Sequence, residues 1–273
     1  MSSLGKRRLI ASVVTLAAAA VSGYGVWLAE IRLGDPATVS GATLLAATIG
    51  LFGLSARKRS KRQIGRPVAV WMQVHVYLGS FACVVFLMHI GWPVYGVFEQ
   101  CLAFVFVFVS ATGVALGFLS RSTPKRLAAL TKDQVFEEIP ALQIAIAGNA
   151  HTVALESTQH GEGATLAEFY QRRLLPYFRS RRSWAYCLVP NGILRRQLLR
   201  ELNDLSRYLG VPGQVSLGQL AQAVRQKDDL DYQYALQARL QYFYAAHVSL
   251  TWSLAILVAV HVALVFRFQG TLQ

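Results

Sequence analysis

Five long apolar segments dominate the sequence and limit the folds that it can adopt. Hydrophobic residues make up 54% of the 273 residues and charged residues only 15%, which is typical of membrane proteins. Most of the segments approach the roughly 20 residues that a helix needs to cross a bilayer; the second, rich in Gly and Ala, is the weakest. We therefore expect an all-α membrane helix bundle with about five transmembrane helices. The segments lie at about residues 9–29, 38–56, 68–93, 98–119 and 240–266.

Basic residues predict the orientation of these helices. The link at residues 56–67 carries six basic residues and no acidic one, and residues 120–239 carry 16 basic and 11 acidic residues. Because lysine and arginine accumulate on the cytoplasmic side, we expect a multi-pass protein of a cell inner membrane, with a cytoplasmic N-terminus and a periplasmic C-terminus. This topology accounts for the net charge of +13, so we expect membrane lipid, and no nucleic acid, as a partner.

The first apolar segment has two interpretations. Basic residues at positions 6–8, an Ala-rich run and small residues after it also occur in signal peptides. The apolar residues continue as far as Leu28, which is long for such a peptide, and we favour a retained helix. Cleavage would leave four crossings in the same orientation.

The predicted helices divide the chain into three parts. Residues 1–119 hold transmembrane helices 1–4, residues 120–239 form an inserted cytoplasmic section, and residues 240–273 hold the fifth helix and a short outer tail. Alternation around Gly148 and Asn149 predicts a β-hairpin in the inserted section, which makes it a small α+β section. The inserted section has no GxGxxG motif and no P-loop, so it lacks a nucleotide-binding fingerprint.

Further features of the inserted section predict helices and a surface. A helix is expected from about Asn191 to Leu209, ended by Gly210, and residues 172–182 form a cluster of arginines and aromatics. This arginine cluster is interpreted either as a face attracted to anionic lipid or as a docking surface for an acidic redox partner. His151 and His160 are interpreted as surface residues. The helix carries a stripe of Leu194, Leu198, Leu202 and Leu205, and helix caps are predicted at Thr131 with Gln134, Thr165 with Glu168 and Ser216 with Gln219.

Two histidine pairs with one spacing are the main functional signal. His75 and His89 lie 14 residues apart in the third segment, and His247 and His261 lie 14 residues apart in the fifth. Fourteen residues make nearly four helical turns, a rise of roughly 21 Å, so the two members of a pair share one face of their helix. Ionisable residues inside a membrane are costly and mark functional sites. We expect these four histidines to be the axial iron ligands of two stacked haems.

Topology predicts how the four ligands pair. The third and fifth segments both run outward, so His75 and His247 form the inner pair, and His89 and His261 form the outer pair. The sequence has no CxxCH motif to attach haem covalently, so we expect two haem b groups. The apolar surround would come from the fourth segment and from Tyr77, Phe81, Phe86 and Trp252, while Gly79 and Gly91 either let a porphyrin approach the backbone or serve ordinary helix packing.

The arrangement of His75, His89, His247 and His261 resembles that of two known families. It is similar to the haem core of cytochrome b from the bc complexes, and to the ferric-reductase-like transmembrane domain of NADPH oxidases and ferric reductases. The sequence lacks the PEWY-type quinol-site motif of the first family and the C-terminal flavin and nicotinamide domains of the second, and a long cytoplasmic section separates its ligand helices. The resemblance therefore implies a di-haem subunit that works with redox partners rather than a self-contained enzyme.

Two functions from different classes are compatible with the sequence. In the first, the chain is a di-haem electron conduit. Its donor would be quinol, a cytoplasmic flavin protein or an iron–sulfur protein, and its acceptor a protein on the other side such as a periplasmic c-type cytochrome. In the second, the chain is a non-redox transporter or scaffold whose histidines pass protons or a metal ion. We favour the first because it explains the repeated spacing.

Overall fold

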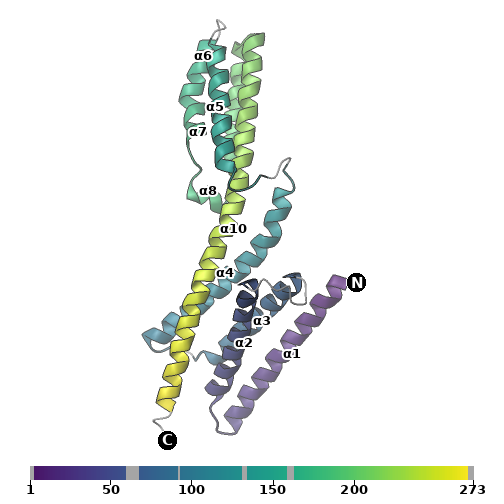
Figure 1. Ribbon diagram of the computed structural model, residues 1–273, viewed down its shortest axis with the longest axis vertical. Coiled ribbons are helices and arrows are strands. Elements are labelled where there is room, and N and C mark those ends of the chain that lie inside the picture. Colours follow the sequence, from purple (N-terminus) through teal and green to yellow (C-terminus); the bar gives the residue numbers. More distant parts are fainter. Residues whose placement is uncertain (1–2, 60–67, 92, 131–133, 159–162, 270–273) are drawn as a thin grey trace. The chain divides into compact units, whose positions relative to one another are not determined.

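The structure of the chain, a computed structural model, describes residues 3–59, 68–91, 93–130, 134–158 and 163–269. Within these residues the chain forms helices and no strand (Figure 1). It divides into a first unit, which holds the residues up to Gly117 and those from His247 onward, and a second unit, Phe118–Ala246. Five described helices are long and apolar enough to cross a membrane. The predicted all-α fold with five long apolar helices is confirmed for the described residues, and it is consistent with a membrane helix bundle.

Three helices, most of a fourth and the end of a fifth build the first unit. Asp35 starts the second of them, because its carboxylate accepts hydrogen bonds from the Ala37 backbone N–H, at 2.9 Å, and from the Thr38 hydroxyl, as an N-terminal cap does. The first three helices pack against one another (Figure 1). The helices are α1 (Ser3–Ile31), α2 (Pro36–Arg59), α3 (Val68–His89), α4 (Val97–Leu127) up to Gly117, and α10 (Val211–Gln269) from His247.

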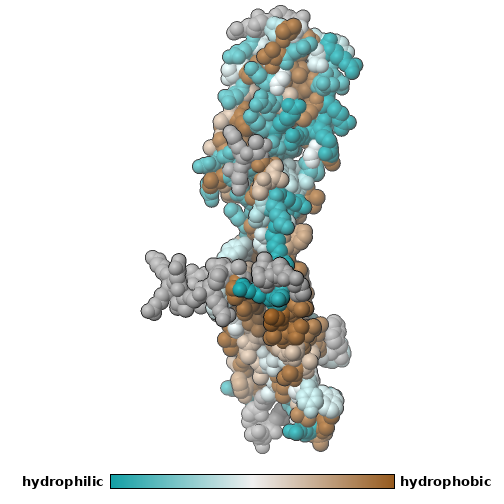
Figure 2. Space-filling model, turned by 90° about the vertical axis from the view of Figure 1, so that its right-hand side faces the viewer, coloured by the Kyte–Doolittle hydropathy of each residue, from teal (hydrophilic) through white to brown (hydrophobic). Residues whose placement is uncertain are grey.

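Large apolar side chains of the first unit lie on its outside. Leu16 is 70% exposed and Val114 is 76% exposed, which a water-soluble helix would avoid over so long a stretch. In Figure 2, hydrophobic residues gather over the helices of this unit on the face in view. Lipid chains are the medium in which such a surface has no cost, so these helices are suited to a bilayer.

A separate apolar core holds the second unit together. The unit contains the end of α4, seven short helices and turns, and the first part of α10, in which Gln219–Gln269 has neither Gly nor Pro to interrupt the helix. Leu166, Leu174, Leu220 and Val224 are fully buried in this core. The other elements are α5 (Ile139–Ser157), α6 (Gly163–Phe169), the π-helical turn η1 (Tyr170–Leu174), α7 (Leu175–Arg179), α8 (Trp184–Leu188), α9 (Ile193–Leu205) and the 3₁₀ turn η2 (Ser206–Tyr208).

The predicted β-hairpin around Gly148 and Asn149 is wrong, and with it the α+β description of the inserted section. Both residues lie inside α5. Ala150, Ala154 and Ser157 are buried at a helical spacing of three and four residues, and alanine is the best helix former. The alternation that indicated strands reflects two partly apolar faces of one helix.

Of the other elements predicted in residues 120–239, one helix is confirmed and two helix starts are wrong. The helix predicted at 191–209 is confirmed as α9 and η2, and Leu198 and Leu202 of its stripe are each only 1% exposed. The predicted helix starts at Thr165 and Ser216 are wrong, because these residues lie inside α6 and α10. Thr131 lies outside the described residues.

The arginine cluster at residues 172–182 is not a continuous exposed surface. Tyr177 and Phe178 are both 5% exposed and belong to the core of the second unit. The Arg173 guanidinium forms two hydrogen bonds with Glu201, at 2.5 and 2.9 Å. Neither the lipid-facing nor the docking interpretation suits the buried part of the cluster.

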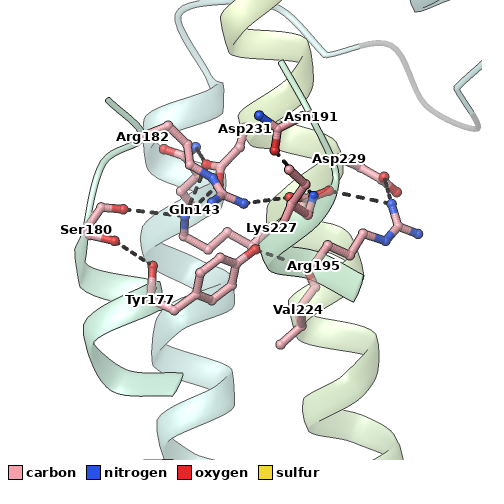
Figure 3. A network of polar contacts seen from close by, with 12 residues as sticks. Gln143, Tyr177, Ser180, Arg182, Asn191, Arg195, Val224, Lys227, Asp229 and Asp231 are labelled. Atoms are coloured by element: carbon pink, nitrogen blue, oxygen red, sulfur yellow. Dashed lines mark hydrogen bonds and ion pairs between the residues drawn. The ribbon is translucent and has the colours of Figure 1, made fainter. Parts of the chain in front are cut away.

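A buried ion network joins α10 to the segment that follows α7 (Figure 3). The Arg182 guanidinium donates to Asp228 at 2.6 Å and to Asp231 at 2.9 Å. The Lys227 ammonium, 2% exposed, donates to both carboxylate oxygens of Asp231, at 3.1 and 2.8 Å. Gln143 of α5 donates a further hydrogen bond to Asp231 at 2.8 Å. At the edge of the network the Arg195 guanidinium lies 3.7 Å from Asp228 and 2.9 Å from Asp229. Three cations thus meet three carboxylates, so the charges of the network balance.

Aromatic rings cover the cations of this network. The Lys227 ammonium lies 4.6 Å from the centre of the Tyr177 ring, and the Arg182 guanidinium lies 4.8 Å from that of Tyr186, within the range of cation–π attraction. Burial raises the pKa of both tyrosines far above its usual range, so their hydroxyls stay neutral. The network is a structural element of the second unit: its charges are paired with one another.

We predict that Asp231→Ala lowers the stability of the second unit strongly. The change leaves Lys227 and Arg182 buried without this carboxylate, a loss of about 3–5 kcal/mol for a broken buried ion pair. Asp229→Ala is the matched control on the same helix, because its carboxylate is half exposed and pairs with the partly exposed Arg195; we expect about 1 kcal/mol or less. Thermal and urea unfolding of the full chain in detergent measure both. Equal losses would contradict a special role for the buried network.

Candidate functional site

The first unit brings the four membrane histidines together as two pairs. The ring centroids of His75 and His247 lie 6.4 Å apart, and those of His89 and His261 also lie 6.4 Å apart. The rings of each pair are nearly perpendicular, with interplanar angles of 77° and 84°. Since α3 and α10 meet at both levels in the same order, the two helices run parallel there. The levels are separated by about 21 Å of helix.

The distance within each pair matches two imidazoles on opposite sides of one metal ion. A bond from a metal ion to an imidazole nitrogen is about 2 Å long, and a ring centre lies about 1 Å behind its nitrogen, so two such rings have centroids about 6 Å apart. Both pairs have this separation, at 6.4 Å. The separation of the ring centroids in each pair is therefore close to the value expected for two imidazoles that share one iron.

Hydroxyl groups on neighbouring helices meet one ring nitrogen in each pair. The Ser40 hydroxyl of α2 lies 3.0 Å from Nδ1 of His89. The Thr112 hydroxyl of α4 lies 3.1 Å from Nδ1 of His247. Histidines that bind a metal commonly use one nitrogen for the metal and the other for such a hydrogen bond. For both histidines, the nitrogen left for a metal is Nε2.

A glycine follows each of these hydroxyl residues and lies against the same imidazole. A Cβ atom placed on Gly41 would be 3.0 Å from Cε1 of His89, and one on Gly113 would be 3.2 Å from Cε1 of His247. Both distances are shorter than ordinary van der Waals contact. The absence of a side chain at these two positions lets the rings lie close to the backbone of α2 and α4.

Three contacts between aromatic rings lie in the helices of the first unit. Phe98 of α4 stacks on the ring of His261, with centroids 6.3 Å apart and planes 15° apart. Phe86 of α3 stacks on Phe106 of α4 at 4.2 Å, and Trp252 contacts the ring of Phe52 at 6.3 Å. Phe86 thus contacts an aromatic ring of α4, and Trp252 one of α2. Their place in an apolar surround of the haems stays a prediction.

The remaining predicted members of the surround have weaker support. The Tyr77 hydroxyl donates to the Arg8 carbonyl oxygen at 3.2 Å, and Phe81 is half-buried. A Cβ at Gly79 or Gly91 would meet no atom within 4 Å. Open space at these glycines agrees both with room for a porphyrin and with a lipid-facing position, so their role stays a prediction.

The donor set suits haem better than a bare metal ion. Protein sites for zinc use three or four protein ligands, whereas a haem iron takes four nitrogens from its porphyrin and needs only axial ligands from the chain. In the described ranges, no group of three or more His, Cys, Asp or Glu side chains could hold a metal ion. Two imidazoles at each level are sufficient for haem and insufficient for such an ion.

The other two histidines and the three cysteines are not part of the four-histidine set. His151 is exposed and contacts the ring of Tyr170, and His160 lies outside the described residues. Cys83, Cys101 and Cys187 form no disulfide. The Cys83 thiol donates to the Ser110 hydroxyl at 3.4 Å and links α3 to α4.

Four residues of the site were missed in the sequence: Ser40, Gly41, Thr112 and Gly113. A hydroxyl residue followed by glycine in an apolar helix was the available signal, in VSGA and ATGV. That signal is weak, because small residues of this kind are common wherever membrane helices pack closely.

Comparison of the chain with protein-family models, with curated proteins and with solved structures found no match. The geometry of the histidine pairs is therefore the basis for a functional proposal.

We predict that alanine at Gly41 or Gly113 destabilises the first unit. Each new Cβ would push on an imidazole, and overpacking of this kind costs about 1–3 kcal/mol. Gly53→Ala and Gly117→Ala are matched controls on the same two helices, because a Cβ at either position meets no atom within 4 Å; we expect them to be neutral or stabilising by about 0.5–1 kcal/mol. Melting temperatures of the full chain in detergent distinguish these outcomes. The close approach would be refuted by equal melting temperatures in each pair of variants.

Proposed function

We propose that the chain is a b-type cytochrome subunit that carries electrons across a cell inner membrane through two haem b groups. His75 and His247 would hold the inner haem, and His89 and His261 the outer one. The observation that carries the proposal is the repeated 6.4 Å separation of the ring centroids at two levels of one parallel helix pair. The equal spacing of 14 residues on two parallel helices brings the second pair together at the same separation as the first, so the chain offers two equivalent sites.

The residues of the chain would bind, orient and insulate the cofactor. When bound, haem supplies a one-electron carrier whose iron alternates between the ferric and ferrous states. His75 with His247 and His89 with His261 would each hold one haem through two imidazoles, so that the chain would leave no place for a substrate at the iron. The apolar side chains of α3, α4 and α10 would exclude water, which influences the redox potential. These features favour electron transfer over catalysis at the iron.

The chain would need an electron donor on one side of the membrane and an electron acceptor on the other. Each transferred electron would come from a donor such as quinol, a flavin protein or an iron–sulfur protein, and would reduce an acceptor on the other side such as a periplasmic c-type cytochrome. The basic excess of residues 56–67 and 120–239 supports a cytoplasmic position for both segments. The chain would thus be the electron-transfer subunit of an oxidoreductase complex.

The test of this proposal is the haem content of the purified protein. We expect two haems per chain by pyridine haemochrome analysis, and a reduced-minus-oxidised spectrum of low-spin, six-coordinate haem b. Single substitutions should separate the sites: His89→Ala or His261→Ala should remove the outer haem, and His75→Ala or His247→Ala the inner one. His151→Ala, in the exposed part of the second unit, should keep both.

Three results would contradict this prediction. A colourless protein that cannot be reconstituted with haem would favour the alternative, a transporter or scaffold that uses the histidines for protons or a metal ion. A high-spin spectrum would contradict two axial imidazoles at each iron. Loss of the same spectral component in His75→Ala and His89→Ala would contradict the assignment of the pairs.

Orientation gives a further prediction. A periplasmic reporter fused after Gln273 should be active, and a cytoplasmic reporter inserted between Thr158 and Gly163 should be active, because the basic excess places residues 120–239 in the cytoplasm. Both fusions are scored with a pair of reporters of opposite compartment requirement. If the reporters placed both positions on the same side of the membrane, the chain would not cross it a fifth time, and the predicted topology would be wrong.

A further inference from the structure

The hydroxyls of Ser40 and Thr112 occupy equivalent positions beside the two histidine pairs. Ser40 lies on α2 next to His89, and Thr112 lies on α4 next to His247. The two contacts link residues that are 49 and 135 positions apart in the sequence. They therefore come from the packing of separate helices and not from local structure.

Each hydroxyl makes the same pattern of hydrogen bonds within its own helix. Ser40 Oγ donates toward the carbonyl oxygens of Pro36, at 2.9 Å, and Ala37, at 3.1 Å. Thr112 Oγ1 donates toward the carbonyl oxygens of Phe108 and Val109, both at 2.9 Å. A hydroxyl has one proton; when that proton is on a carbonyl oxygen of the preceding turn, the hydroxyl oxygen can accept a hydrogen bond from an imidazole Nδ1–H.

Hydrogen bonds in this direction correspond to one tautomer of the two rings. An Nδ1–H group that donates to the hydroxyl oxygen makes Nδ1 the protonated nitrogen, so the lone pair of the neutral ring is on Nε2. Bonds of serine and threonine to the preceding turn are common in helices, and Thr43 and Thr48 of α2 form them too. The hydroxyls of Ser40 and Thr112 differ from these because each also contacts an imidazole nitrogen.

We propose that Ser40 and Thr112 are positioning residues, one for each haem, that hold Nε2 of His89 and of His247 toward the iron. This inference rests on the proposed function. Ser40 is 1% exposed, so water does not compete for its hydroxyl. The anchored ligand alternates between the helices: it belongs to α3 at the outer level and to α10 at the inner level.

The two hydroxyls also set the potentials of the two levels independently. An imidazole that donates its Nδ1–H is a more basic ligand, and a more basic ligand stabilises ferric over ferrous iron. Loss of the hydroxyl should therefore raise the midpoint potential of one haem. A tenfold change in the ratio of the two oxidation states corresponds to a shift of about 59 mV for one electron.

Redox titration of the full chain, followed by the haem b spectrum, tests the inference. Ser40→Ala should raise the potential of the outer component alone, and Thr112→Val, which keeps the shape of the side chain, that of the inner component alone. Ser40→Thr and Thr112→Ser keep a hydroxyl and should keep both potentials. Thr43→Ala removes a hydroxyl of α2 that bonds to the Val39 carbonyl oxygen and should change neither component.

The outcomes separate this inference from the proposed function. Selective loss of one haem, with the other spectrum and the helix content unchanged, also supports the inference, because it shows that the hydroxyl acts on one level. A wild-type chain with two haems whose potentials stay unchanged in Ser40→Ala and Thr112→Val overturns the inference and leaves the proposed function standing. So does an equal shift of both components in either variant. A wild-type chain that binds no haem overturns both.

Discussion

A polar nitrogen inside a hydrocarbon environment has a cost of several kcal/mol unless a partner satisfies it, and the first unit is arranged around this constraint. Four imidazoles lie in apolar helices, as two pairs with ring centroids 6.4 Å apart. For two of them, a ring nitrogen meets a hydroxyl, that of Ser40 or Thr112. The glycines at positions 41 and 113 let the neighbouring helices approach closely enough for these contacts. The packing of α2 and α4 against the ligand helices is thus tied to the position of the histidines.

The second unit solves the same problem with ions. Arg182 and Lys227 bring two positive charges into a place shielded from water, and Asp228 and Asp231 neutralise them at hydrogen-bonding distance. A buried ion pair of this type adds little net stability relative to apolar residues, but the loss of one partner is strongly destabilising. The network therefore explains why α10 and the segment after α7 have one relative position within this unit, and it requires no ligand.

Hydropathy and periodicity patterns in the sequence predicted some elements correctly and others wrongly. The five apolar helices and the leucine stripe of α9 follow from hydropathy and the helical period, which act over many residues at once. The hairpin predicted at Gly148 and Asn149 relied on a few alternating residues, and the alanines of the same segment pack as one face of α5. Tyr177 and Phe178 were assigned to a basic surface because arginines flank them in the sequence. Both rings belong to the core of the second unit, which the order of residues does not show.

The sequence by itself determined the apolar helices and the shared face of histidines 14 residues apart. The reason is that the thickness of a bilayer and the pitch of an α-helix are the same for every chain. Only the tertiary structure decided which groups stand beside each ring. Ser40 and Thr112 reach His89 and His247 from other helices, across 49 and 135 residues, and the contacts depend on how far each helix is rotated about its axis. Close packing sets that rotation, through side chains that are distant in the sequence.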